Sequence, residues 1–515
     1  MSDADWSQGY VTDTTYVDRF FRELSPTWLN YVAALNGINP PELAQSFTYL
    51  ELGSGFSTSA IINAGAFPRG EFHACDFNAA HIAGARSHAA ALGIGNIQFH
   101  EASFQDLSSL DLPLFDFIVA HGVYSWVGAE ARQAIRHIIQ KKLKPGGLVY
   151  LSYNCLPGWS VEVPLRKLLV ELAAGSSDTP QRTEHALGSL KDLSSSKLRY
   201  FNDNPAALNA VDSYIKGPSN YLAHEFLNQA WEPFYSIDIA AEMAEVGASY
   251  IGSATLVDNH ETLVVHDAAA RAVAKLETSR QRELAIDFAV NRRFRRDVFV
   301  RETASRRRAE TTQLRAIVIG SVDNPERIST RVTVPRGVIT FQEDFIRDVQ
   351  ALMKHGSMTI GEAIAALTGP GRNAIEITRN LIFLVAAGAL LPFAKTHDFI
   401  KASKAPRPRN AMVERALAHI IEQQAQGAIP SEVLGNGVPI KPVEALAISE
   451  LLAGAGEPGT LAKRLEAEIR RLGLKIKSDG KLLQPGPELS NYVRVTAHTV
   501  IDDLLPNLVR LDLFV

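Results

Sequence analysis

The chain has 515 residues, which is too many for one hydrophobic core and predicts about three domains. Hydrophobic residues make up 46% and charged residues 21%, a composition that is ordinary for a globular protein and excludes extensive disorder. A formal net charge of −4 excludes a global attraction to nucleic acid or to an anionic membrane, so either partner would need a local basic patch.

The N-terminus, the cysteines and the apolar runs indicate a cytoplasmic protein. The first ten residues are acidic and polar and lack the apolar core of a secretory signal. Cys75 and Cys155 show neither C-x-x-C nor Cys/His spacing, so we expect no disulfide framework and no metal site. The longest apolar run, residues 381–393, is shorter than the roughly 20 residues that cross a bilayer, so we expect no membrane span.

Residues 46–154 alternate short β-branched or aromatic runs with longer helix-like stretches. This alternation predicts successive βα units and a doubly wound α/β fold with a parallel sheet. The predicted strands are 48–52, 71–76, 97–101, 115–121 and 148–153. The predicted helices are 57–64, 79–92 and 130–142, and the Lys-Pro-Gly-Gly run at 144–147 predicts a helix stop and a turn.

Helix-forming residues dominate the next part of the chain, and residues 161–245 are therefore predicted to be a helical insertion that serves as a regulatory domain. Strand patterning returns at 249–256 and 262–266. Sheets of this type commonly finish with an antiparallel hairpin. We therefore assign residues 246–270 to the last strands of the core that begins with residues 1–160.

The C-terminal half is predicted to be mainly α-helical. Residues 271–340 form an Arg-rich helical connector, with nine arginines between Asn291 and Arg315. Residues 341–402 read helix, turn, helix, turn, with an apolar helix at 377–387 and a strand-like tail at 390–393, a pattern typical of a winged-helix-like module. A basic, Pro-containing linker at 403–409 precedes an α-rich domain at 410–515.

The sharpest motif, Glu51-Leu52-Gly53-Ser54-Gly55, follows the first predicted strand and opens the first helix. Gly53 and Gly55 allow a tight turn around Ser54, and the helix N-terminus beyond offers unpaired N–H groups to a ligand. The dinucleotide fingerprint G-x-G-x-x-G is not met. Glu51 would repel a pyrophosphate but suits a ligand with an amino group and a sulfonium, such as S-adenosyl-L-methionine.

Asp76 ends the second predicted strand, 25 residues after Glu51, and is followed by Phe77. A carboxylate at this position can accept both hydroxyls of a ribose, and Phe77 offers an apolar face to adenine. Asp76 alone could equally be a helix N-cap. In combination, Glu51 and Asp76 favour methyl transfer from S-adenosyl-L-methionine over hydride transfer.

The remaining parallel strands also end in ligand-type residues. Ser103 and Phe104 follow the third strand, where an adenine edge would lie. The fourth strand leads to His121, Tyr124 and Trp126, and the fifth to Tyr153, Asn154 and Trp159. We place His121 beside the cofactor and the other five residues in a substrate slot. The alternative is that His121 is an ordinary buried histidine and the aromatic residues belong to the core or a domain interface.

Together with the segments at 23–29 and 220–226, these motifs resemble class I S-adenosylmethionine-dependent methyltransferases of bacteria that carry a methyltransferase regulatory domain, among them the rickettsial-type protein-lysine methyltransferases. The resemblance implies a Rossmann-like, seven-stranded methyltransferase sheet. It also implies cofactor contacts from Glu51, Gly53, Gly55, Asp76, Ser103, Phe104 and His121. In two places the chain departs from the family pattern, because Ser57 replaces a frequent third glycine and Ser103 a frequent adenine-binding Asp. The sequence leaves open whether these changes weaken cofactor binding.

The expected activity is N-methylation of lysine side chains in a protein or peptide substrate. Such a displacement needs alignment and exclusion of water, with Tyr124 or His121 taking or relaying the proton of the amine. One alternative is a methyltransferase of small molecules or peptide natural products. Another is a nucleic-acid-binding regulator with a vestigial core, which salt-bridged arginines would argue against. A homodimer is left open.

Overall fold

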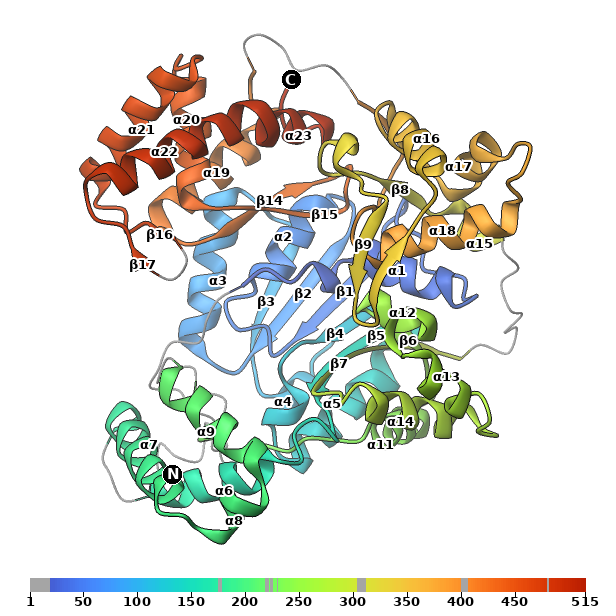
Figure 1. The fold of residues 1–515 in the computed structure, drawn as a ribbon, viewed down its shortest axis with the longest axis vertical. Coiled ribbons are helices and arrows are strands. Elements are labelled where there is room, and N and C mark those ends of the chain that lie inside the picture. The colour runs from blue at the N-terminus through green and yellow to red at the C-terminus, as the bar shows by residue number, and fades with distance from the viewer. Residues whose placement is uncertain are drawn as a thin grey trace.

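The computed structural model describes residues 19–174, 178–217, 222, 226–228, 230–302, 312–399, 406–478 and 481–515. At its centre lies a seven-stranded sheet in the order β3-β2-β1-β4-β5-β7-β6 (Figure 1). The first five strands are parallel, and β7 is antiparallel to both β5 and β6. The strands are β1 (Thr48–Leu52), β2 (Glu71–Asp76), β3 (Ile97–Glu101), β4 (Phe115–Ala120), β5 (Leu143–Asn154), β6 (Ala248–Ser253) and β7 (Phe294–Arg301). The expected α/β methyltransferase sheet is confirmed.

Helices cover both faces of this sheet. One face packs on α1 (Pro26–Leu35), α2 (Thr58–Ala66) and α3 (Ala79–Leu92), and the other on α4 (Phe104–Leu107), α5 (Ala129–Lys142) and α11 (Ser236–Glu245). Local chemistry sets the ends of α3, because the Asn78 side chain accepts the N–H of Ala80 and Gly93 ends the helix at a φ of 72°. The β1, β2, β3 and α3 bounds match those expected from the sequence.

Two expectations about this sheet are wrong. Residues 262–266 do not form a strand, because the first three of them lie in α12 (Glu261–Val264). The strand that pairs with β6 is instead β7. The region expected to be a helical connector thus contains a core strand. Arg295 and Asp297 of β7 are buried as an ion pair, so the strand lacks the apolar pattern by which buried strands are recognised. Residues 144–147 lie inside β5 rather than in a turn after α5.

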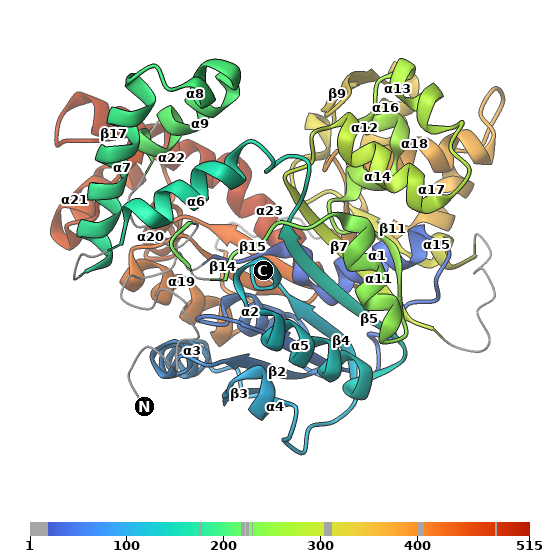
Figure 2. The same ribbon diagram turned by 90° about the horizontal axis from the view of Figure 1, so that it is seen from below.

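The predicted helical insertion is confirmed. It contains α6 (Glu162–Leu172), α7 (Thr179–Ser195), α8 (Arg199–Asp203) and α9 (Pro205–Lys216), which enclose a small hydrophobic core of their own. Figure 2 shows these helices and the segment α12–α18 on opposite sides of the molecule. Most of the motif at 220–226 lies outside the described residues, which include only Leu222 and Phe226 of it.

The following lobe combines helices with short strands. The expected apolar helix and strand-like tail are present as α18 and β12, and the small sheet has the order β12-β8-β11-β13. The winged-helix assignment and the domain boundaries stay predictions. The elements are α13 (Asp267–Val273), α14 (Ser279–Ala289), α15 (Thr312–Ala316), β8 (Val318–Gly320), β9 (Arg331–Val334), β10 (Gly337–Thr340), α16 (Glu343–Met353), β11 (Gly356–Thr359), α17 (Ile360–Leu367), α18 (Ala374–Ala386), β12 (Leu391–Phe393) and β13 (His397–Asp398).

The C-terminal region packs onto α2 and α3, and one cluster of buried side chains joins it to the sheet. Residues 403–405 of the predicted linker lie outside the described residues. Among the helices of the described segments, none combines the length and apolar character that crossing a membrane requires. The elements are α19 (Ala411–Gln423), β14 (Gly427–Ser431), β15 (Asn436–Ile440), α20 (Pro442–Leu452), α21 (Pro458–Leu472), β16 (Lys477–Ser478), β17 (Lys481–Leu482), α22 (Pro487–Thr499) and α23 (Leu505–Arg510).

Candidate active site

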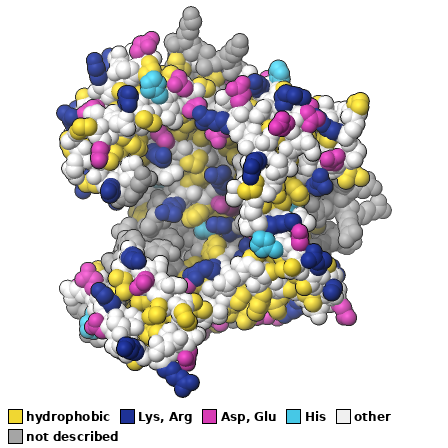
Figure 3. All heavy atoms as spheres, viewed as in Figure 1, with side chains coloured by type: hydrophobic (Ala, Val, Ile, Leu, Met, Phe, Trp, Pro, Cys, Tyr) yellow, Lys and Arg dark blue, Asp and Glu magenta, His cyan; other side chains and the backbone are white. Residues whose placement is uncertain are grey.

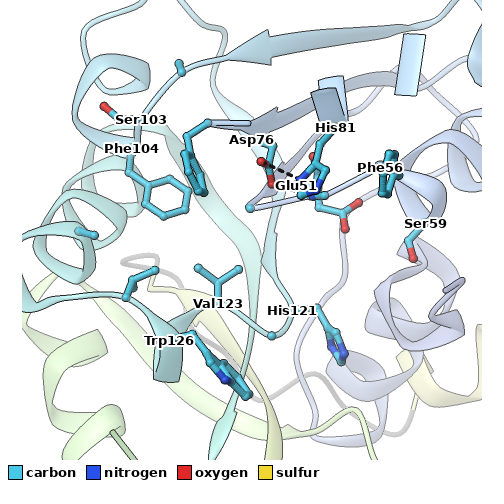
Figure 4. A pocket seen from close by; sticks show the side chains of 18 of the residues that line it. Glu51, Phe56, Ser59, Asp76, His81, Ser103, Phe104, His121, Val123 and Trp126 are labelled. Carbon is cyan, nitrogen blue, oxygen red and sulfur yellow. Dashed lines mark hydrogen bonds and ion pairs between the residues drawn. The ribbon is translucent and has the colours of Figure 1, made fainter. Parts of the chain in front are cut away.

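A cavity opens at the carboxyl ends of β1, β2 and β4 (Figure 4), where an open α/β sheet binds its ligands. It encloses about 1310 Å³, part of which is open to solvent. Ten of the residues predicted from the sequence line it: Glu51, Gly53, Ser54, Gly55, Asp76, Phe77, Ser103, Phe104, His121 and Trp126. The structure therefore brings together the whole predicted cofactor set.

The turn between β1 and α2 presents its backbone to this cavity. Gly53 and Gly55 have φ values of 63° and 54°, in the region that favours glycine. A Cβ on Gly53 would lie 2.5 Å from a methyl group of Val123, whereas a Cβ on Gly55 would meet nothing within 4 Å. Ser54 N–H donates to the Cys75 carbonyl over 3.0 Å, which fixes the turn to β2. The open side at Gly55 leaves room for a ligand.

Ser57, the first departure from the family pattern, adopts a backbone conformation that favours glycine. Its φ is 56°, in the left-handed region, and its hydroxyl lies 2.8 Å from that of Ser54. The turn is thus preserved without the third glycine.

Asp76 is 6% exposed, and its carboxylate joins the two loops of the cavity. One oxygen accepts the N–H of Gly55 over 2.8 Å, and the other accepts the N–H of Asn78 over 2.9 Å and lies 3.2 Å from His81 Nδ1. Asn78, rather than Asp76, caps α3. Because a carboxylate offers about four acceptor positions, Asp76 can still receive a hydrogen bond from a ribose hydroxyl.

The adenine end of the cavity differs from the expectation. The Ser103 hydroxyl is engaged locally, since it donates to the Asp106 carboxylate over 2.7 Å and accepts the Asp106 N–H as the cap of α4. Gln105 also lines the cavity, and its Oε1 is buried with no hydrogen-bond partner in the part of the chain that the structure describes. Sequence reasoning missed Gln105, although its polar side chain follows Phe104 directly.

His121 forms the opposite, aromatic end of the cavity. Its Nδ1 lies 2.8 Å from the Tyr150 hydroxyl, and its ring packs against Phe21 with 3.9 Å between centroids. Burial, together with the positive charge of Arg296, lowers the pKa of His121 to about 3. The imidazole is therefore neutral at physiological pH. Figure 4 shows His121 and Trp126 on one side of the opening and Glu51 and Asp76 on the other.

Tyr124, a predicted catalytic residue, does not line the cavity. It is fully buried, and its hydroxyl donates to Glu242 over 2.5 Å and accepts from Arg136 over 2.9 Å. Burial, with the bonded Glu242 carboxylate, raises the pKa of Tyr124. Tyr124 thus links the end of β4 to α5 and α11.

Three other predicted substrate residues also lie outside the cavity. The Tyr153 hydroxyl donates to Asp297 over 2.5 Å, the backbone N–H of Asn154 donates to Ser125 over 2.9 Å, and the Trp159 indole donates to the Arg293 carbonyl over 2.8 Å. All three residues are buried. Tyr153 thus joins β5 to β7, and Trp159 joins the core of the insertion to the residue before β7, which for these two aromatic residues is the interface role of the alternative interpretation. Asn154 joins β5 to the turn after β4.

Three described arginines at the start of the Arg-rich stretch form salt bridges within the protein. Arg292 pairs with Asp258 at 2.9 Å, Arg293 pairs with Glu162, and Arg295 bridges Asp287 and Asp297. These salt bridges argue against a DNA-binding role for the described arginines.

The cavity fits S-adenosylmethionine. Glu51, which is 5% exposed, and Asp76 supply negative charge for a cationic ligand and acceptors for ribose hydroxyls. The turn at Gly55 is open, and the Gln105 oxygen can accept a hydrogen bond from the adenine amino group. Across the described ranges, no cluster of three or more His, Cys, Asp or Glu side chains is arranged to hold a metal.

Two families match parts of the chain. Residues 50–149 match the family described as a methyltransferase domain, and residues 218–301 match the family described as a predicted methyltransferase regulatory domain. The second match contains β6 and β7, so the regulatory region supplies two strands of the sheet.

The chain is similar over nearly its whole length to the protein sll1526 of Synechocystis sp., with 31% identity over 508 residues, 98% of this chain and 99% of that protein. RP789 of Rickettsia prowazekii is 30% identical over 278 residues, 53% of this chain and 49% of that protein. Among solved structures, PKMT2 from Rickettsia typhi in complex with AdoHcy aligns with a TM-score of 0.69 and 19% identity, covering 97% of this chain and all of that one (100%). This chain and PKMT2 therefore share one fold throughout.

Proposed function

Because this chain belongs to the family of S-adenosylmethionine-dependent methyltransferases with a methyltransferase regulatory domain, we propose that it N-methylates lysine side chains of a protein. The observation that carries the proposal is the aromatic wall of His121 and Trp126 across the cavity from the two carboxylates, with Phe21 packed on His121. A lysine amine reacts only when deprotonated, and a poorly solvated wall disfavours its ammonium form.

The residues of the cavity divide into those that hold the cofactor and those that face the acceptor. Glu51, Asp76 and Gln105 hold the cofactor, which supplies an electrophilic methyl group on a sulfonium. Tyr150 fixes the ring of His121 through Nδ1, so Nε2 is the ring nitrogen that would form a hydrogen bond with the acceptor. With a pKa of about 3, His121 orients the amine but does not retain its proton, which passes to solvent.

Two further observations favour a polypeptide acceptor. Figure 3 shows one face of the molecule hollowed between the lobe of α19–α22 and the lobe of α6–α9, as an extended substrate would require. The fold is shared from end to end with the R. typhi protein named PKMT2. The sequence resemblance to rickettsial-type protein-lysine methyltransferases points in the same direction.

The test is incubation of the protein with labelled S-adenosylmethionine and cell lysate, followed by mass spectrometry for mono-, di- or trimethyl-lysine. We expect label in protein and much less label with Asp76→Ala, because that substitution weakens cofactor binding. Label found only in small molecules or nucleic acid would contradict the lysine assignment. Failure to label any fraction, despite cofactor binding, would contradict the enzymatic role.

A further inference from the structure

Residues 19–25, here called the N-terminal strap, form one wall of the cofactor cavity. Arg19 and Phe21 line it, and the Phe21 ring packs on His121 at 3.9 Å. The N–H of Phe21 donates over 3.0 Å to the hydroxyl of Ser59, another lining residue on α2. The strap therefore sets the shape of the cavity beside His121.

The β14–β15 hairpin of the C-terminal region is hydrogen-bonded to this strap. The Asn436 amide donates to the Arg22 carbonyl over 3.0 Å, and the Ser25 hydroxyl donates to the Gly435 carbonyl. These bonds join residues that are 414 and 410 positions apart in the chain. The middle and the C-terminal end of the strap are thus bonded to the hairpin.

Next to these two bonds the hairpin backbone also lies directly against Phe20 of the strap. A Cβ on Gly437 would lie 2.7 Å from the Phe20 ring and 2.6 Å from an Ile62 methyl group. Such distances leave no space for any side chain other than that of glycine. Because Phe20 precedes Phe21, a shift of the hairpin would move the residue that packs on His121.

We propose that the β14–β15 hairpin is a positioning element of the cofactor site, which acts through the strap to place Phe21 and Arg19 at the cavity. This role explains why a region remote from the cofactor loops packs against α2. The proposal rests on the cofactor site alone, so it stands or falls independently of the acceptor.

The test measures AdoHcy affinity by isothermal titration calorimetry on the full chain. Asn436→Ala removes one hydrogen bond to the strap, and we expect the dissociation constant to rise about three- to tenfold. If the effect passes through Phe21, Asn436→Ala adds less than about a 1.5-fold change in a Phe21→Ala background. Full additivity of the two substitutions would overturn the proposal.

Ser431→Ala is the matched control. The Ser431 hydroxyl accepts the N–H of Leu434 within the hairpin and donates to the carbonyl of Leu511 after α23, each over 3.2 Å, and neither partner belongs to the strap. It should destabilise the hairpin and leave AdoHcy affinity unchanged. An equal loss of affinity in both variants would show that the hairpin contributes stability only, and would overturn the proposal.

Hydrogen exchange on the unmodified chain gives a second test that needs no variant to fold. On addition of AdoHcy we expect slower amide exchange in peptides covering both the strap and residues 432–440. Protection of the strap with unchanged exchange in the hairpin would contradict the coupling between them.

Discussion

Two regions of the molecule each bury a pair of carboxylates, with opposite consequences. At the cavity, Glu51 and Asp76 are 5% and 6% exposed, and beside β7 the carboxylates of Asp287 and Asp297 are 0% and 2% exposed. In the second region Arg295 forms ion pairs with both carboxylates, since it contacts Asp287 at 2.8 Å and Asp297 at 2.9 Å. Asp76 instead binds backbone N–H groups and one histidine. Burial of a charge therefore does not identify a ligand site; the partners of the charge do.

The pairing of buried charges also explains why the regulatory region, residues 218–301, belongs to the core. Its strand β7 carries the buried arginine, and burial raises the pKa of Asp297 to about 6 despite the opposing effect of Arg295. Ser236 of α11 also donates to Asp287 over 2.6 Å. This region is thus part of the folded core, whatever its effect on catalysis.

The largest expected effect comes from Arg295→Met, which leaves the buried Asp297 without its cation and leaves Asp287 with Arg292 at 3.5 Å. The free energy of unfolding should fall by about 3–5 kcal/mol, as measured by urea denaturation. Arg280→Met, which removes an exposed pair with Asp238 at 3.5 Å, is the control and should cost about 0–1 kcal/mol. Equal losses in both variants would contradict the structural difference between the sites.

Asp76→Ala tests the other region. Loss of hydrogen bonds from a charged group should weaken AdoHcy binding about 10- to 150-fold by calorimetry. The exposed Asp111→Ala serves as the control and should bind normally. Unchanged affinity in Asp76→Ala would mean that the cofactor lies elsewhere.

A smaller effect is expected from Gln105→Ala, which removes one neutral hydrogen bond. AdoHcy affinity should fall about three- to tenfold. The wild type should also prefer AdoHcy to its analogue with an oxo group in place of the adenine amino group, and Gln105→Ala should lose this preference. Exposed Gln98→Ala is the control. A preserved preference would remove Gln105 from adenine recognition.

The smallest effect at neutral pH is expected from His88→Gln, at the contact between α3 and α19. His88 stacks on His419 at 4.4 Å, and burial with the charge of His419 lowers the pKa of His88 to about 4. The unfolded chain then binds more protons, so stability falls as the pH drops from about 6.5 towards 4. Melting temperatures at pH 7.5 and 5.0 should differ less in His88→Gln than in the wild type; an equal difference would contradict this sign.

Sequence reasoning succeeded at the cavity because its signals are local. A glycine turn, an acid at a strand end and the following helix lie within a few residues of one another, and ten predicted residues line the cavity as a result. It failed for Tyr124, Tyr153, Asn154 and Trp159, whose side chains could face either a ligand or a neighbouring element. Partners such as Glu242 and Asp297, far away in the chain, decide this.

The amino-acid sequence by itself determined the βα order, the bounds of β1, β2, β3 and α3, and the chemistry of Glu51 and Asp76, because periodicity and capping act over short distances. Only the tertiary structure decided that β7 is a core strand. Its charged residues Arg295 and Asp297 can be buried because they form an ion pair with each other, and buried charges need such partners. The tertiary structure likewise decided that a C-terminal hairpin holds the N-terminal strap, a contact that no local pattern encodes.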